Sequence, residues 1–584
     1  MIVNQNVNER EIPATATLQD PEFWLFREMP LRLLVPVALI AAAVGWVAVA
    51  LNAPTLVAVA IGAVVLLIGI APVRKREPRT PAGMFARSIG YRWRRSKPGP
   101  EETDATAFDV PLPEGGSYGM RWDGGLLITM LRIDPPPDAL TLLRPGSLAT
   151  DQVLALDEIA RCLGQFDINL ASIDVISTGA RTASVGAVAQ LYDRIVGPLP
   201  AIAHRTVWLV LRLEPLANAD AVESRGGGST GALRTSIITT RRVANKLAAQ
   251  GISTSVLTAG EMNSAVRQLT RNIPLEEFTE TPNSLGYHGI HLTSYEIGPD
   301  LIGERGFADI WATPSLTTTV TVRVRQAPRR PTTVRDNEPT PITLGALVRF
   351  DTAFEPEQPP IAGLRRMPGR QFRALVDCLP TGSGRPSTSD YRGPLEALSD
   401  LAVPTAGCGQ LIGADNTGQG IAVPLIGDGT RHLEVSGKLD LAQQVVLRAI
   451  ALGARAVVHT DRPEAWHTMV SNVGAPHLLS LAPRSAGASH HPPPVVPNSG
   501  MPFPTATVVV FDGIPPTALT GGATVVHVRA PGQPSGFDAD VILTQDATSP
   551  NRITVRTSTV HTTVNMVTTP DEMRYIGESL TAAR

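Results

Sequence analysis

The chain has 584 residues, which is too long for a single domain of about 100–200 residues. Hydrophobic residues make up 43% of it and charged residues 18%, and this composition excludes a largely disordered protein. The net charge of −2 excludes a nucleic-acid-binding protein of the basic kind, and three widely separated cysteines exclude a disulfide framework and a cysteine zinc site.

Two uncharged segments near the N-terminus predict a pair of membrane-spanning helices. Residues 33–51 and 53–73 contain 19 and 21 residues without a charged side chain. At a rise of about 1.5 Å per residue, each can cross a hydrocarbon core of about 30 Å. Asn52 and Pro54 favour a tight turn between them. We therefore expect a two-helix transmembrane hairpin over residues 33–73, preceded by a cytosolic segment at 1–32.

The basic segment that follows sets the predicted orientation. Nine basic residues and one acidic residue lie between positions 74 and 97, which gives a local charge of +8. Because positive flanks stay on the cytoplasmic side, both termini and the bulk of the chain are expected in the cytosol, with the hairpin in the inner (plasma) membrane. The alternative is an amphipathic segment that lies on anionic lipid headgroups. The membrane-flanking residues singled out are Arg74, Lys75, Arg76, Arg79, Arg92, Arg94 and Arg95.

After a basic linker at 74–116, residues 117–360 predict a first cytosolic α/β domain. Strand-like and helix-like patterns alternate along it, and the proline-rich stretches near residues 326–341 and 354–360 are expected to be connections. We therefore place a domain boundary near residue 360. The expected strands are 126–133, 168–176, 206–213, 252–257, 317–325 and 344–350, and the expected helices are 150–166, 185–196, 229–250 and 260–270.

Residues 361–584 predict a second cytosolic α/β domain. It contains a hairpin around residues 415–418, followed by alternating helices and apolar strands. The expected strands are 410–413, 420–425, 432–435, 456–459, 507–511, 523–528, 541–543 and 552–556, and the expected helices are 369–379, 440–452, 463–473 and 570–584.

The strand, turn and helix around Lys438 have the layout of a phosphate-binding loop. A P-loop needs GxxxxGK[ST], in which amides hold phosphates, the lysine reaches them and the hydroxyl binds magnesium. Here Leu439 follows the lysine, and His432 stands at the first glycine position. The strand ending at Asp512 resembles a Walker B strand, but Gly513 follows where a glutamate is expected. We expect a degenerate P-loop-like nucleotide-binding fold, with Lys438 and Asp512 as its candidate contacts and an active NTPase as the alternative.

One serine-containing motif is typical of the nucleophile of a serine hydrolase. Residues 227–231 match the GxSxG of serine hydrolases, but the polar residues 218–225 before them do not form the required buried strand. We expect a loop that caps the next helix through Ser229 or Thr230 instead.

Metal-binding motifs are also incomplete. Residues 538–540 match the DxD that holds a metal and a sugar nucleotide, with an exposed loop as the alternative. The histidine pairs 288/291 and 490/491 lack the further ligands of a zinc shell. No complete set of nucleophile, base and phosphate- or oxyanion-binding groups is present, so we expect no cofactor and no enzymatic activity.

In this order the features resemble the EccE family, a membrane component of the mycobacterial type VII (ESX) secretion system. The N-terminal hairpin and the basic segment are part of the resemblance, which covers most of the chain. Its other segments are Tyr118-Gly119-Met120-Arg121-Trp122-Asp123-Gly124 with 126–129, the region 117–250, 409–415 with 423–425, and 441–448 with 458–463.

The resemblance implies a structural role without catalysis. The family is placed at the periphery of an inner-membrane complex with EccB, EccC and EccD, in which EccC is the ATPase, and it supplies no catalytic motif. The region after Gly409 is also similar in layout to FtsK/EccC-type ATPases. We expect a membrane-anchored scaffold whose hairpin packs against partner helices through small residues, namely Ala41, Ala42, Gly45, Ala58 and Gly62.

Two other functions stay open. One is a nucleotide- or nucleotide-sugar-binding membrane-anchored enzyme that acts through the C-terminal domain. The other is a lipid sensor built on residues 74–97.

Overall fold

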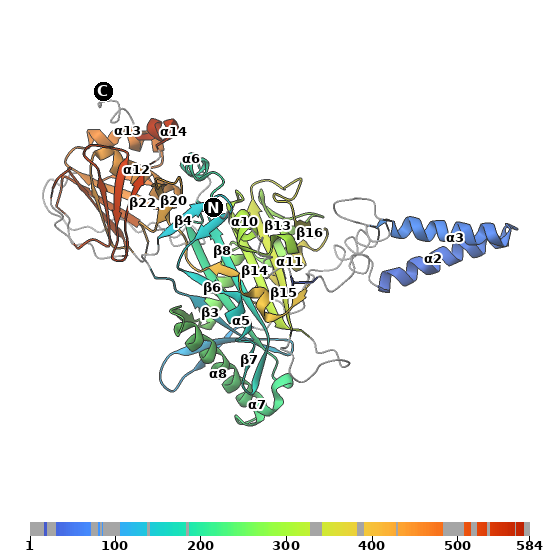
Figure 1. Cartoon of the computed structure of the whole chain (residues 1–584). Coiled ribbons are helices and arrows are strands. Elements are labelled where there is room, and N and C mark those ends of the chain that lie inside the picture. Colours follow the sequence, from blue (N-terminus) through green and yellow to red (C-terminus); the bar gives the residue numbers. More distant parts are fainter. Residues whose placement is uncertain are drawn as a thin grey trace, which may run out of the picture.

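The described residues form a mixed α/β structure (Figure 1). The computed structural model describes residues 17–19, 31–71, 80, 81, 85, 106–136, 140–182, 186–327, 341–381, 390–427, 430–482, 507–515, 522–533, 538–566 and 568–576. The predicted α/β class is confirmed at this level.

Two apolar helices near the N-terminus form a hairpin. They are α2 (Leu31–Ala50) and α3 (Thr55–Ile70), and the turn between them contains Asn52 with a positive φ of 62°. Asparagine adopts this left-handed conformation more easily than most residues. Figure 1 shows the two helices side by side and apart from both large sheets.

Small residues make the contact between the two helices. A Cβ built on Gly62 would lie 3.1 Å from the carbonyl oxygen of Ala41, and one built on Gly45 would lie 3.2 Å from that of Ala58. Ala41 and Ala58 are buried, whereas Ala42 is exposed. The prediction that these residues face partner helices is therefore wrong for all but Ala42, because the other four are used within the hairpin.

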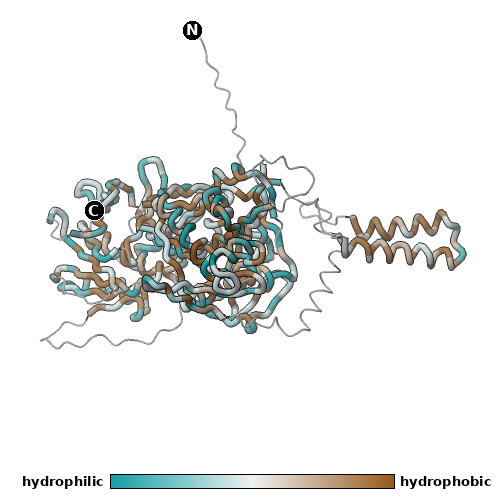
Figure 2. Tube along the Cα trace, turned by 90° about the horizontal axis from the view of Figure 1, so that it is seen from below, coloured by the Kyte–Doolittle hydropathy of each residue, from teal (hydrophilic) through white to brown (hydrophobic). Residues whose placement is uncertain are grey.

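Hydrophobic residues predominate along both helices of the hairpin (Figure 2). Leu39, Trp46, Leu56 and Leu67 are each exposed over more than three-fifths of their surface. Within the described ranges, no helix combines the length and the apolarity needed to cross a membrane. The predicted membrane-flanking residues lie outside the described residues: Arg74, Lys75, Arg76, Arg79, Arg92, Arg94 and Arg95.

The first sheet has 14 strands and is antiparallel throughout. Four strands lie off its main path: β10 (Thr254–Val256), β16 (Leu364–Arg366), β17 (Tyr391–Gly393) and β7 (Gly164–Gln165) pair with β3, β13, β15 and β8. The main path runs through β1 (Phe108–Pro111), β2 (Ser117–Asp123), β3 (Leu126–Ile133), β9 (His204–Leu213), β8 (Ile168–Ala180), β14 (Thr317–Gln326), β15 (Ile342–Thr352), β13 (Ile290–Ile297), β12 (Leu285–Tyr287) and β11 (Thr279–Glu280).

Helices cover both faces of this sheet. One face, with Val175 and Val320, packs against α5 (Leu156–Ala160), α8 (Gly228–Ala248) and α10 (Glu304–Ala312). The other face packs against α9 (Ala259–Leu269) and α11 (Gln371–Asp377). The central strands are consequently buried on both sides, although the alternating pattern of β14 predicts a half-buried strand.

The second large sheet has 12 strands, of which the first six in spatial order are parallel. Four helices share its main core: α6 (Ala187–Val196), α12 (Leu439–Ala451), α13 (Glu464–Val473) and α14 (Pro570–Ile576). The order is β23 (Leu479–Leu481), β22 (Arg455–Thr460), β24 (Thr507–Asp512), β25 (Thr524–Arg529), β21 (His432–Ser436), β26 (Val541–Gln545), β27 (Arg552–Arg556), β28 (His561–Asn565), β19 (Gln410–Ala414), β20 (Gly420–Val423), β4 (Thr141–Arg144) and β5 (Ser147–Ala149).

The two sheets share segments of chain. β4, β5 and α6 come from the first half of the sequence but complete the second sheet and its core, and the amide of Leu411 donates to Tyr192 Oη at 2.8 Å. In the other direction, β16 and β17 lie beyond residue 360 yet belong to the first sheet. Sheet membership therefore changes between Gly393 and Gln410, and the division into units at 117–360 and 361–584 stays a prediction.

One predicted helix is wrong over most of its length. A helix is expected from Thr150 to Phe166, whereas α5 covers only Leu156–Ala160. The preceding residues form β6 (Val153–Ala155), which pairs with β18 (Ala402–Pro404) in a separate two-stranded sheet. A partner from the far half of the chain thus overrides the local helical pattern.

Candidate functional site

The carboxyl ends of the parallel strands form the candidate site. The chain leaves β21 through α12 toward β22 on one side, while β26 lies on the other side of β21. In open α/β sheets, ligands bind outside the carboxyl ends of the strands where the direction of winding reverses. Lys438 follows β21 and Asp512 ends β24, so the structure places both candidate residues on this edge, two strands apart.

The chain's own side chains surround Asp512. The carboxylate is fully buried and accepts hydrogen bonds from Trp466 Nε1 at 2.9 Å and from Thr460 Oγ1 at 2.9 Å. Arg462 donates through Nε at 2.9 Å to one oxygen and through an Nη atom at 2.5 Å to the other. Both oxygens are therefore occupied by donors from β22, α13 and the turn between them, which is the arrangement of a structural carboxylate.

Electrostatics agrees with this interpretation. Burial acts to raise the pKa of Asp512, but hydrogen bonds from Arg462, Trp466 and Thr460 outweigh burial and hold the pKa below its usual range. The hydrogen bond with Asp512 also raises the pKa of Arg462. Asp512 is thus a carboxylate at neutral pH, held by a permanent cation.

The position where a P-loop would hold phosphate is filled by Gln545. The Gln545 Oε1 atom accepts the amide of Lys438 at 2.7 Å, and its Nε2 donates to the carbonyl of Pro550 at 2.7 Å. A Cβ built on Gly437 would lie 2.7 Å from the same Oε1. Asp440, in the first turn of α12, adds a buried acidic group whose pKa is raised by burial. An acidic group in the first turn of the helix disfavours a bound phosphate.

The serine motif lies at a helix start and does not form a nucleophile elbow. Residues 227–231 follow the short helix α7 (Ala219–Glu223), and Gly227 is the N-cap of α8 with φ 66°. Ser229 and Thr230 are exposed and lie inside the first turn, and the N-cap has no side-chain hydrogen bond. The predicted cap through these hydroxyls is therefore wrong, because the helix begins one residue before Ser229.

The metal-binding motifs have structural roles in the described chain. Asp540 of the DxD accepts the amides of Arg431 and His432 at 2.7 and 2.8 Å, and so fixes the start of β21. His288 lies in the turn between β12 and β13, and His291 Nδ1 lies 3.4 Å from Ser284 Oγ. No group of three or more His, Cys, Asp or Glu residues is suited to a metal within the described ranges. The pair at 490/491 lies outside them.

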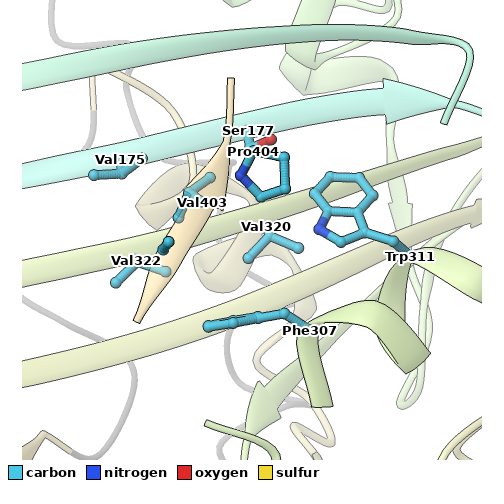
Figure 3. Close-up of a pocket in the computed structure, with 9 residues that line it drawn as sticks. Val175, Ser177, Phe307, Trp311, Val320, Val322, Val403 and Pro404 are labelled. Atoms are coloured by element: carbon cyan, nitrogen blue, oxygen red, sulfur yellow. The ribbon is translucent and has the colours of Figure 1, made fainter. Parts of the chain in front are cut away.

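Two cavities lie near the contact between the sheets. A cavity of about 10 Å³ beneath β18 is lined mainly by apolar side chains from β8, α10, β14 and β18 itself, including Val175, Trp311 and Val403 (Figure 3). It is at the lower limit for one water molecule. An open hollow of about 520 Å³ lies between the β4–β5 turn and the end of α10, with Arg305 and Asp309 as its charged lining residues. Neither resembles a preorganised catalytic pocket.

A buried charged cluster stabilises the first sheet. Asp174 accepts hydrogen bonds from Arg212 and, at 2.8 and 2.7 Å, from Arg323. Burial acts to raise the pKa of Asp174, but the two guanidinium groups outweigh it and keep the pKa below its usual range. Arg323 also donates to the Asp377 carbonyl at 3.1 Å. The cluster therefore links β8, β9 and β14 to the end of α11.

Comparison with known proteins connects the chain to type VII secretion. Residues 201–297, which run from β9 to β13, match the family model described as a type VII ESX secretion system translocon, EccE. The ESX-2 secretion system protein EccE2 of Mycobacterium tuberculosis is 26% identical over 362 residues, which is 61% of this chain and 63% of that protein. Over these residues the chain is similar to EccE proteins of type VII secretion systems. The predicted resemblance to the EccE family is thus confirmed, and the matched proteins are named as components of type VII secretion systems.

Other EccE proteins match smaller parts of the chain. The ESX-1 secretion system protein EccE1 of Mycolicibacterium smegmatis is 32% identical over 166 residues, or 28% of this chain and 35% of that protein. The ESX-5 secretion system protein EccE5 of Mycobacterium marinum is 25% identical over 282 residues, or 46% of this chain and 66% of that protein. The chain therefore matches less than two thirds of the length of each of these relatives.

Sequence reasoning missed the residues that fill the edge. Arg462 and Trp466 follow β22, and Gln545 ends β26, so the rule that singles out Asp512 could also have found them. These three side chains fill the edge of the sheet. The sequence alone does not distinguish residues that fill the edge from residues that bind a ligand there.

Proposed function

We propose that the chain is a non-catalytic, membrane-anchored structural subunit of a type VII (ESX) protein secretion complex in the inner (plasma) membrane. The observation that carries this proposal is the occupied carboxyl edge of the parallel strands. Asp512 is saturated by Arg462, Trp466 and Thr460, and Gln545 takes the Lys438 amide. A site built for chemistry leaves such groups free for a substrate.

The hairpin supports the membrane part of the proposal. Its outward residues are large and apolar, and residues 33–73 contain no charge. Exposed apolar patches of this kind are typical of lipid or protein contact. Insertion with both termini in the cytosol would place Asn52 on the far side of the membrane, with Arg74 and its basic neighbours at the cytosolic surface.

The proposed partners are the other membrane components, EccB, EccC and EccD. Membranes solubilised in mild detergent are separated by native size through a C-terminal tag, and co-purifying chains are identified by mass spectrometry. Migration in a large assembly with these components is the expected result. Recovery of the tagged chain as a monomer or dimer would refute the proposal.

A nucleotide- or nucleotide-sugar-binding enzyme is the second candidate. The reversal of winding at β21 favours it, since ligands gather at such points. Binding of ATP or a UDP-sugar to the full chain, lost on Asp512→Ala or Asp540→Ala while the fold is kept, would support this function. The full chain is required because α6 and β4 complete the core of the second sheet. No binding at millimolar nucleotide would exclude it.

A further inference from the structure

A short segment before the hairpin is bonded to the first sheet. The amide of Gln19 donates to the carbonyl of Arg392 at 2.8 Å, and the amide of Arg392 donates to the carbonyl of Gln19 at 2.8 Å. The two residues form an antiparallel bridge at the edge of β17 opposite to β15. Unpaired backbone groups on an open strand edge are a template for pairing with another segment. Residues 17–19 provide that segment here.

The side chain of Leu18 fixes the segment in place. It is only 8% exposed and belongs to the main hydrophobic core of the first sheet. A glycine at position 393 of β17 leaves room for it, because a Cβ there would lie 2.9 Å from Leu18 Cδ2 and 3.4 Å from the Cβ of Ala397. Thr17 and Gln19 on either side are exposed. A buried leucine between two exposed residues, with a paired backbone, is typical of an extended segment that adds to a sheet edge.

The position of this segment limits how far the hairpin can lie from the first sheet. Eleven residues separate Gln19 from Leu31, where α2 begins. An extended chain reaches about 3.3–3.6 Å per residue, so this connection spans at most about 40 Å. After the hairpin, 37 residues separate Ile70 from Phe108. That connection alone would permit about 130 Å, so the bridge at β17 shortens the permitted separation about threefold.

We propose that residues 17–19, named here the N-terminal strap, add a strand to β17 and keep the start of the hairpin within about 40 Å of this edge of the first sheet. The interaction surface is the open edge of β17, and its occupant is the chain's own N-terminal segment. Figure 1 shows the hairpin and the second sheet on opposite sides of the first sheet. A hairpin inserted in the membrane would therefore hold β17 near the cytosolic surface and keep the second sheet away from it. This consequence rests on the proposed function.

A disulfide between positions 19 and 392 tests the strap in the full-length chain in its native membrane. Two residues that exchange both backbone hydrogen bonds have Cα atoms about 5.5 Å apart, which suits a disulfide. Gln19→Cys combined with Arg392→Cys should give a linked peptide under a mild oxidant, and mass spectrometry identifies it. The native thiols do not compete, because Cys162, Cys378 and Cys408 are buried.

Three further substitutions in this double-cysteine chain show what holds the strap. Leu18→Asp should lower the yield of the linked peptide about tenfold, because it removes a buried leucine and puts a charge in its place. Thr17→Asp puts the same charge on the exposed neighbour and should leave the yield unchanged. Gly393→Val fills the space of Leu18 from the side of the sheet and should lower the yield as Leu18→Asp does. No linked peptide with Leu18 in place, or an equal yield with Leu18→Asp, would overturn the inference.

The distance between hairpin and sheet is a second readout. Spin labels at Val35, which is 54% exposed, and at the exposed Glu396 beside β17 report it in the reconstituted chain. The distribution should extend to longer distances with Leu18→Asp and not with Thr17→Asp, and identical distributions would overturn the inference. Co-purification is scored separately. A linked peptide in a chain that recovers no secretion component supports the strap and refutes the proposed function, whereas a missing linked peptide with recovery intact overturns the strap alone.

Discussion

The substitution Asp512→Ala tests whether Asp512 is a structural carboxylate or a ligand-binding one. The substitution leaves the indole N–H of Trp466, which is fully buried, without an acceptor. An unsatisfied buried donor costs about 1–3 kcal/mol. The pair with Arg462 adds up to about 1 kcal/mol, because that side chain is 52% exposed and screened by solvent. We expect Asp512→Ala to lower the free energy of unfolding of this region by about 1–4 kcal/mol.

The matched control is Asp512→Asn. An amide oxygen in place of the Oδ2 atom still accepts from Trp466 and Thr460, whereas the amide NH2 in place of Oδ1 cannot accept from the Arg462 Nη atom, so the charge and one hydrogen bond with this half-exposed side chain are lost. The asparagine variant should therefore lose only about 1 kcal/mol. Native-state hydrogen exchange of the amides of β22 and β24 is the suitable measurement, because a chain with two large sheets need not unfold in one step. An alanine variant as stable as the unmodified chain, or more stable, would refute the structural interpretation of Asp512.

Low pH should weaken the contact between Asp512 and Arg462 over a defined pH range. Because the pKa of Asp512 is lowered in the folded chain, its contribution to stability is complete above the usual pKa of 3.8 and is lost as the pH falls through the lower folded value. Asp512→Asn should flatten this part of the stability profile, and an unchanged profile would contradict the assignment. Arg448→Met should destabilise α14 by about 3–5 kcal/mol, since it leaves the Glu572 carboxylate, which is fully buried, without its cation. The double variant Arg448→Met/Glu572→Leu should recover at least half of that loss in hydrogen exchange of residues 570–576, and strict additivity would exclude the pairing. His204 Nε2 donates to the Leu452 carbonyl at the end of α12 at 2.7 Å, and burial lowers the pKa of His204. Stability should therefore fall as the pH drops below 6.5, where the unfolded chain takes up a proton that the folded chain resists, and His204→Gln should reduce this slope in urea titrations at pH 5 to 7.

Periodicity predicted the elements whose partners are close in sequence. The Gly124–Gly125 turn joins β2 and β3 in a hairpin, and the apolar patterns of β9, α8 and α12 give elements within two residues of their predicted bounds. α9 begins with a capping box between Thr258 and Glu261, which is a local signal. Local patterns carry this much of the fold because backbone hydrogen bonds and side-chain periodicity act over a few residues.

The unpredicted parts depend on partners far along the chain. The pattern of α6 predicts a helix, but nothing in it indicates that Tyr192 packs in the second core beside Leu411. The small residues of the hairpin are correctly identified as a contact surface, yet Gly45 and Gly62 face each other's helix instead of a partner. At the candidate site, strand order places Lys438 and Asp512 on one edge, while Gln545 fills it from 107 residues away.

Because the two sheets share segments, residues that contact each other are synthesised at different times. Tyr192 leaves the ribosome 219 residues before Leu411, its hydrogen-bond partner. At about 5–20 residues per second, this interval is roughly 10–40 s. For that time the apolar face of α6 has no second core to enter, and the first sheet is itself still being completed, because β9 to β17 lie between Tyr192 and Leu411 in the sequence. The nascent chain is thus most exposed to aggregation after its N-terminal hairpin and before its second sheet, when chaperones have the longest opportunity to bind.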